Sequence, residues 1–174
     1  MITSTIQTAT LINQMEQTAS GLIETLQHVS DSHFNRKPSA KKWSIAQVAD
    51  HICLSNQSIS KALALHGMEV DRDPAERIEE LKDVFLDFTK TYESPSFIVP
   101  KKEAYNRQEL MNELLRSLQQ IHRLMYNTEL NVVINHPAFG DISKLEILHF
   151  VLFHTQRHLR QIKLIHEELI IEKS

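Results

Sequence analysis

An all-α fold is the class that this sequence of 174 residues predicts, and three observations indicate it. The chain holds only three glycines and five prolines, fewer than a turn-rich β fold requires. Apolar residues recur at helical spacing over four long segments. Hydrophobic residues make up 41% of the chain and charged residues 24%, which is ordinary for a globular protein. We expect a single domain over residues 1–174, a four-helix bundle with a long, partly helical connection between helices 2 and 3.

The first two helices are predicted in the N-terminal part of the chain. The first covers residues 3–28, where apolar positions follow a helical period. The second begins at "SIAQ", which has the form of a capping box between Ser44 and Gln47. We expect it to run to about His66, because Gly67 suits the position that follows a helix.

The long connection, residues 67–106, contains signals for one further short helix. Asp73 is a good N-cap, and Pro74 suits the first helical position after it. Residues 93–102 are expected to be extended, because each proline disfavours helix in the residue before it. The third long helix is predicted to open at Asn106.

The fourth long helix carries the most informative stretch of the sequence. We expect a turn at residues 135–141, and then a second capping box, "SKLE", at residues 143–146. The helix should continue to about Ile171. Within it, "HFVLFHTQRHLRQI" holds three of the ten histidines of the chain.

Two of these three histidines are predicted to share the buried face of the fourth helix. At about 100° per residue, His154 and His158 fall on the apolar stripe, whereas His149 falls among charged residues and is expected in solvent. Imidazoles at positions i and i+4 project from adjacent turns, so both can reach one metal ion. The alternative is that two core histidines bond to buried carbonyls or hydroxyls.

A third ligand is needed for a metal site, and His51 is the leading candidate. It lies at the edge of the apolar stripe of the second helix, so the periodicity leaves open whether it points inward or towards solvent. His66 and His122 are weaker candidates. The remaining histidines lie near helix ends or in loops and are expected at the surface: His28, His33, His136 and His166.

Composition excludes several classes of function. The net charge of −3 and the absence of a Lys/Arg stripe argue against nucleic acid as a partner. The apolar runs are too short to span a bilayer, and no signal peptide is visible at the N-terminus. Cys53 is the only cysteine, which excludes an internal disulfide and fits a reducing compartment. We therefore expect a cytoplasmic protein in which Cys53 is a packing residue.

Two segments of the chain resemble the DinB-like superfamily, which includes the YfiT-type metal-dependent hydrolases. They are "KKWSIAQVADHI" and, a hundred residues later, "HPAFGDISKLEILHFVLFHTQRHLRQI". The resemblance covers nearly the whole chain in helix order. The positions that match the pattern of the family are Trp43, Ser44, His51, His154, His158 and Gln161.

The resemblance implies a four-helix bundle in which His51, His154 and His158 hold a divalent metal ion, and it implies frequent homodimers. Some relatives are thiol S-transferases that use bacillithiol or mycothiol. Three neutral imidazoles leave at least one coordination position open, which is the pattern of catalytic zinc sites, and nickel also suits nitrogen ligands.

We therefore expect a metal-dependent hydrolase or thiol S-transferase that acts on a small molecule, with a low-molecular-weight thiol as one candidate partner. The sequence identifies no general base. Two alternatives remain at this point. One is a non-catalytic helical protein that binds a metal or a small ligand, and the other is a scaffold that dimerises through a helix face.

Overall fold

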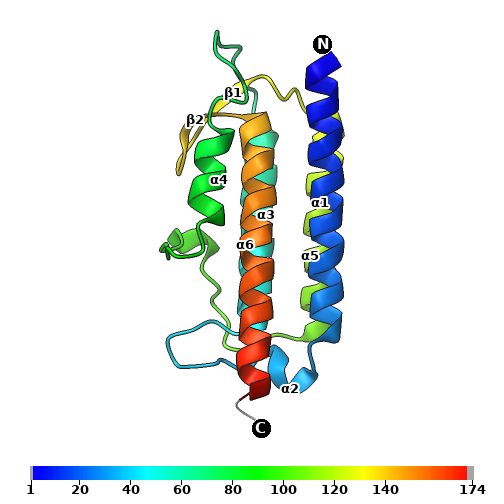
Figure 1. The fold of residues 1–174 in the computed structure, drawn as a ribbon, viewed down its shortest axis with the longest axis vertical. Helices are drawn as coiled ribbons and strands as arrows, with labels where there is room; N and C mark the ends of the chain where they lie inside the picture. The colour runs from blue at the N-terminus through cyan, green and yellow to red at the C-terminus, as the bar shows by residue number, and fades with distance from the viewer. Residues whose placement is uncertain (1, 172–174) are drawn as a thin grey trace.

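Four long helices form a bundle, as the sequence predicts (Figure 1). The computed structural model describes residues 2–171, with side chains from residue 8 onward; Met1 and residues 172–174 of the predicted domain lie outside this range. The helices run parallel or antiparallel to one axis, with α1 and α6 pointing one way and α3 and α5 the other. Their bounds are Ile2–His28 for α1, Ile45–Leu63 for α3, Arg107–Asn127 for α5 and Lys144–Ile171 for α6.

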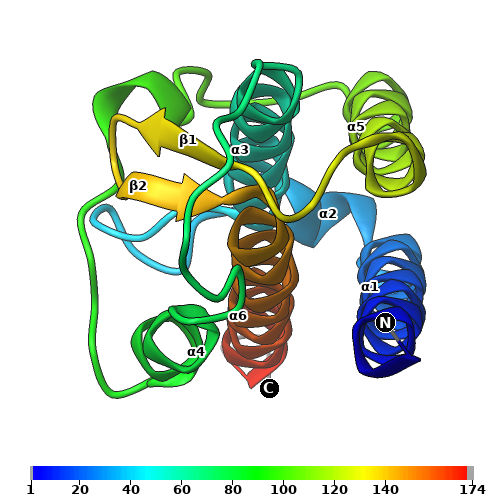
Figure 2. The same ribbon diagram turned by 90° about the horizontal axis from the view of Figure 1, so that it is seen from above.

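The bundle carries a second layer on one side. Viewed from above, α6 packs against both α1 and α3, and α3 packs against α5 (Figure 2). The short helix α4 (Ile78–Leu86) packs on the outer side of α6, next to a two-stranded antiparallel sheet. Its strands are β1 (Val133–His136) and β2 (Gly140–Ser143). Two shorter elements, α2 (Asp31–Phe34) and the 3-10 helix η1 (Ser96–Ile98), lie in the loops.

The apolar stripes of the four long helices meet in two buried clusters. Because these residues recur every three or four positions, each helix presents one apolar face to the others. One cluster contains Leu22, Leu26, Ile45, Val48, Ile52, Leu114 and Ile162. The other contains Leu11, Ile59, Leu63, Ile121, Ile147 and Val151.

Both predicted capping boxes are present. The Ser44 hydroxyl accepts from the Gln47 N–H at 3.2 Å, and the Gln47 side-chain oxygen accepts from the Ser44 N–H at 3.0 Å. In the same way, Ser143 accepts from the Glu146 N–H at 3.0 Å, and the Glu146 carboxylate accepts from the Ser143 N–H at 2.7 Å. Each box satisfies two backbone N–H donors that a helix start would leave unpaired.

The end of α3 differs from the prediction. The helix stops at Leu63, earlier than expected, and Gly67 is not its terminating residue. A Cβ atom at Gly67 would lie 2.4 Å from the Val132 Cγ2 atom, so only glycine fits there. This close approach lets the main chain of Met68 pair with that of Val133 at 2.9 Å in both directions.

Two other local predictions are wrong in detail. Helix α4 begins at Ile78 rather than directly after Asp73, because the Asp73 side chain accepts from the Ala75 N–H at 2.8 Å and forms a turn. The turn expected at residues 135–141 is the tip of the hairpin β1–β2, where Gly140 has a φ of +64°. Glycine adopts this left-handed conformation without strain.

Glu146 attaches the connection to α6. Its carboxylate is fully buried and accepts from the Arg72 guanidinium at 2.8 Å on each oxygen, and from the Arg77 N–H at 2.9 Å. Burial raises the pKa of Glu146, but the hydrogen bonds from Arg72 and from the N–H groups of Ser143 and Arg77 outweigh it, so that the pKa is lowered. The start of α4 is thereby fixed beside the start of α6.

We predict that Glu146→Ala lowers the free energy of unfolding by about 3 kcal/mol, because it leaves Arg72 and buried N–H donors without their acceptor. A group whose pKa is lowered on folding stabilises the protein above its ordinary pKa, here 4.5, and this contribution is lost as the pH falls further. The stability of the variant should therefore decline less in acid. Chemical denaturation between neutral and acid pH measures both effects.

The exposed Glu129→Ala is the matched control and should change stability by no more than about 0.5 kcal/mol. Equal stability of Glu146→Ala and the parent at neutral pH would contradict this role for Glu146.

Candidate metal centre

Three histidines from two helices converge on one point inside the protein. The Nε2 atom of His154 lies 3.1 Å from the Nε2 atom of His51 and 3.2 Å from that of His158. Each of the three offers one ligand nitrogen, and these atoms lie within 4.8 Å of one another. His51 is 1% exposed and His154 is 5% exposed, while His158 is partly buried. His51 therefore points inward, which the helical periodicity alone did not decide.

The spacing of the nitrogens suits a divalent metal ion. Nitrogens that lie 2.0–2.1 Å from one zinc ion at tetrahedral angles are about 3.3 Å apart. The two short separations in this cluster differ from that value by only a few tenths of an ångström. The three histidines could thus hold one ion with little movement of their rings.

Hydrogen bonds to the far side of two rings make their Nε2 atoms acceptors. The Nδ1–H of His51 donates to the Ile98 carbonyl at 2.7 Å, and the Nδ1–H of His158 donates to the Gln161 side-chain oxygen at 2.7 Å. A neutral imidazole carries one proton, so both Nε2 atoms present lone pairs towards His154. One proton on His154 cannot satisfy both lone pairs, whereas one cation bound by all three rings can. The donor set therefore fits a metal ion.

The cluster is held neutral. Burial lowers the pKa of His51, and it lowers the pKa of His154 well below the usual range, with further repulsion from the other rings and from Arg157. Burial, together with the proximity of His51, lowers the pKa of His158 to about 3. Neutral imidazole is the form that binds metals, so the site is ready for a metal ion at neutral pH.

The three histidines line a cavity of about 950 Å³ between the bundle and its second layer. Its wall is formed by α3 and α6 on one side, and by α4, the segment that contains η1, and the hairpin on the other. Three aromatic rings lie closest to the site: Trp43 at 5.1 Å from His51, and Phe150 and Phe85 at 5.1 and 6.2 Å from His154, between ring centroids. A coordination position that faces this cavity can be reached by a small molecule.

His136 lines the same cavity, although the sequence places it in a surface loop. It is 6% exposed, and its Nδ1 atom accepts from the Ala138 N–H at 3.1 Å. Its proton is therefore on Nε2, where it can donate to a molecule in the cavity. Burial lowers the pKa of His136, which keeps the ring neutral. The only signal for this residue was its place in "HPAFG", whose folding into a hairpin beside α6 was not predicted.

His149 and His33 also differ from the prediction, since neither lies free in solvent. His149 is half-buried because α4 covers this side of α6, and its Nδ1–H donates to the Leu145 carbonyl at 3.0 Å. His33 is buried, and its ring packs edge-on against His166 at 5.7 Å. Neither residue lines the cavity that holds the cluster.

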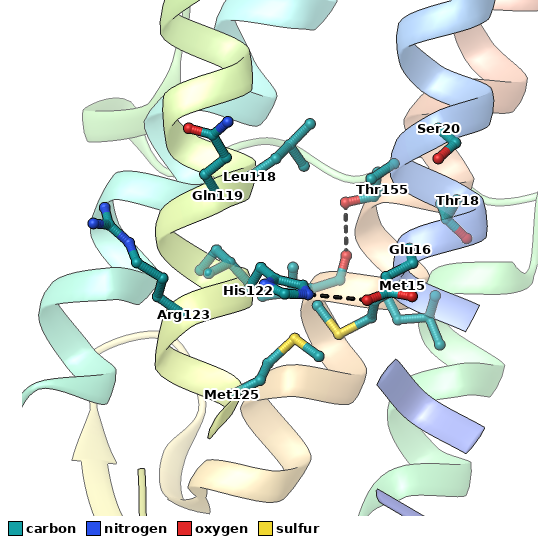
Figure 3. Close-up of a pocket in the computed structure, with 14 residues that line it drawn as sticks. Met15, Glu16, Thr18, Ser20, Leu118, Gln119, His122, Arg123, Met125 and Thr155 are labelled. Carbon is teal, nitrogen blue, oxygen red and sulfur yellow. Dashed lines mark hydrogen bonds and ion pairs between the residues drawn. The ribbon is translucent and has the colours of Figure 1, made fainter. Parts of the chain in front are cut away.

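The two weaker candidates for a third ligand lie elsewhere. His66 is exposed beyond the end of α3. His122 borders a second cavity of about 490 Å³ between α1, α5 and α6, and its Nε2 atom lies 2.9 Å from the Glu16 carboxylate (Figure 3). Apolar side chains such as Met15 and Met125 dominate this second cavity, which shares no lining residue with the first.

Neither Cys53 nor Asp50 belongs to the cluster. Burial, with the charges of Asp50 and Glu113, raises the pKa of the Cys53 thiol to about 12, so the thiol is a packing group. The Asp50 carboxylate accepts from the Tyr105 hydroxyl at 2.7 Å. His51 is oriented instead by the Ile98 carbonyl, which lies 47 residues further along the chain.

Fold and cluster together define a four-helix bundle protein with a three-histidine site in a side cavity. The chain belongs to the DinB superfamily, whose sequence profile matches residues 14–162. YuaE of Bacillus subtilis strain 168, an uncharacterized protein, is 28% identical over 148 residues, which cover 83% of this chain and 90% of YuaE.

Two solved structures share the fold. One is YfiT of Bacillus subtilis, described as a probable metal-dependent hydrolase with an unusual four-helix bundle topology; its TM-score is 0.61 at 15% identity, covering 94% of this chain and 87% of YfiT. The other is the four-helix bundle protein TT2238, with a TM-score of 0.59 at 14% identity, covering 90% of this chain and 98% of TT2238. Among residues 2–171, no helix is long and apolar enough to cross a membrane.

We predict that His154→Ala strongly weakens metal binding, because His154 is the ring that lies close to both of the others. Protein purified after incubation with zinc should hold about one ion per chain, and the variant about tenfold less. Elemental analysis measures the content, and circular dichroism verifies that the variant is folded. His122→Ala is the control and should keep its zinc, since His122 borders the other cavity. Equal zinc in His154→Ala and the control would contradict the site.

Gln161→Leu should weaken metal affinity by about 10–100-fold while leaving the three ligands in place, because His158 loses the acceptor that fixes its tautomer. Competition with a coloured chelator measures the affinity. Gln57→Leu, on the exposed side of α3, should bind zinc as tightly as the parent. Unchanged zinc affinity in Gln161→Leu would show that His158 does not need the hydrogen bond to Gln161 in order to bind the metal.

Proposed function

We propose that this protein is a metal-dependent enzyme that acts on a small molecule bound in the cavity beside His51, His154 and His158. The convergence of the three Nε2 atoms carries the proposal, since two of them are fixed as acceptors from outside the cluster. The structural similarity to YfiT, which is described as a probable metal-dependent hydrolase, supports a metal-dependent reaction. Three protein ligands leave a position for substrate, which is the arrangement of catalytic rather than structural zinc sites.

A divalent ion held there would act as a Lewis acid, able to lower the pKa of a bound water or of an incoming thiol. The residues of the chain supply the remaining functions. His51, His154 and His158 would hold the ion, and Ile98 and Gln161 orient two of the rings. Trp43, Phe85 and Phe150 form the apolar wall of the cavity nearest to the three rings.

His136 is the side chain suited to position the substrate. Its Nε2–H has no hydrogen-bond partner among the described residues, and its neutral ring can donate to a carbonyl or phosphoryl oxygen without adding charge. Because a backbone N–H fixes its tautomer, this donor is ready before the substrate binds. Hydrolysis and thiol S-transfer would use the same site and would differ in whether water or a thiol attacks.

The test is a two-way assay of the zinc-loaded and nickel-loaded protein. One arm supplies activated esters and amides in water, and the other supplies electrophiles with a panel of low-molecular-weight thiols. We expect turnover in one arm that is abolished by His154→Ala and reduced about 10–100-fold by His136→Phe, which keeps a ring but removes the donor.

The metal content of His136→Phe is measured on the same sample and should be unchanged. A loss of turnover in this variant then comes from the missing N–H donor and not from a loss of metal. Stoichiometric metal without turnover in either arm would favour the non-catalytic binding protein over the enzyme.

A further inference from the structure

The cavity beside the three histidines is positively charged, although the chain as a whole carries a net charge of −3. Five cationic side chains line it, against two carboxylates. The carboxylates are Glu93 and Glu168, and the cations are Lys41, Lys42, Lys90, Arg157 and Arg160. A low-dielectric pocket that concentrates one sign of charge attracts ligands of the opposite sign.

Ion pairs within the protein neutralise only part of the excess of positive charge in the cavity. Lys42 contacts both oxygens of Glu168 at 2.8 and 2.9 Å, and Lys90 pairs with Asp87 at 3.2 Å. Within residues 8–171, neither Arg160 nor Lys41 forms an ion pair. These two side chains are free to meet an anion that enters the cavity.

Arg157 adds a fixed positive charge next to the cluster. Its guanidinium donates to the carbonyl oxygens of Phe85 and Asp87 at 3.1 and 3.0 Å, and also to that of Lys90. These carbonyls orient the group without neutralising its formal charge. Arg157 directly precedes His158 in α6 and lines the same cavity as the three histidines.

The rest of the wall is aromatic. Seven of the eleven Phe, Trp and Tyr residues of the chain line this cavity. Phe88, Tyr92 and Phe97 are about half exposed, at 46%, 51% and 53%, and because all three line one cavity they form the kind of exposed apolar patch that marks a binding site. The Arg160 guanidinium lies 4.8 Å from the centroid of Phe88, so a cation and an apolar surface are adjacent at the same wall.

We infer that the cavity takes an organic anion with an aromatic or bulky apolar body, whose carboxylate lies at Arg160 and whose body packs against the aromatic wall. The inference rests on the proposed function only for the reacting end of the molecule, which would face the three histidines. A neutral molecule would leave the free cations unpaired, and a small anion without an apolar body would leave the exposed rings in water.

The experiment compares three probes: 4-phenylbutanoate, its neutral amide 4-phenylbutanamide, and butanoate, which lacks the ring. Trp43 is the only tryptophan and lines the cavity, so its fluorescence reports binding at this site, and calorimetry gives Kd. We expect 4-phenylbutanoate to bind about tenfold more tightly than either of the other two. Equal affinity for 4-phenylbutanoate and the amide would overturn the inference.

Arg160→Gln tests whether Arg160 is the group that makes the cavity prefer a carboxylate to an amide. It should reduce the preference for carboxylate over amide about three- to tenfold, with affinity for the amide unchanged. Arg116→Gln, an exposed arginine on α5, is the matched control and should keep the preference. A preference that survives intact in Arg160→Gln would contradict the assignment.

The titrations are run on zinc-loaded and on chelator-treated protein, so that a carboxylate bound directly to zinc is separated from one bound by Arg160. An Arg160-dependent preference in metal-free protein would support the anion site even if the protein proved to hold no metal. If the protein binds one zinc ion per chain but shows no preference for the carboxylate, the proposed function would remain supported and the inference of an anionic ligand would be wrong.

Discussion

The close approach of three imidazole nitrogens is the constraint on which the rest of this structure depends. Two of the rings donate outward through Nδ1, so their Nε2 lone pairs face the Nε2 atom of His154 at 3.1 and 3.2 Å. Lone pairs at this distance repel one another unless a proton or a cation lies between them. A proton on the Nε2 atom of His154 can be donated to only one of these two lone pairs. The other lone pair still lacks a partner, and a metal ion bound by all three nitrogens would supply one.

The long connection between α3 and α5 supports that arrangement from outside. Ile98, in η1, supplies the carbonyl that sets the tautomer of His51, and the Glu146–Arg72 pair holds the beginning of the connection to α6. The same segment carries Phe88, Tyr92 and Phe97, which line the cavity. It therefore supports one of the three histidines and supplies 12 of the 31 residues that line the cavity.

Features that depend on neighbouring residues were predictable from the sequence. The four long helices, the capping boxes at Ser44 and Ser143, and the shared face of His154 and His158 all follow from spacing within one segment. The position of His51 at the edge of an apolar stripe made it the leading candidate for a third ligand but left its orientation open, and the resemblance to the DinB-like superfamily implied that it joins the other two.

Features that depend on distant contacts were not predictable. The inward turn of His51 requires the Ile98 carbonyl, and the burial of His149 requires α4 to pack on α6. His136 lines the cavity only because a hairpin forms where a simple turn was expected, and its pairing with Gly140 depends on the left-handed conformation of that glycine. In each case the missing information was the partner across space rather than the local pattern.

X-ray absorption spectroscopy of the zinc-loaded protein identifies the atoms bound to the metal, and it can therefore establish whether His51, His154 and His158 are its ligands. We expect three imidazole nitrogens at about 2.0–2.1 Å from the zinc, together with one light atom from solvent or buffer. A sulfur ligand, a site completed by a fourth protein side chain, or fewer than three imidazoles would contradict this expectation.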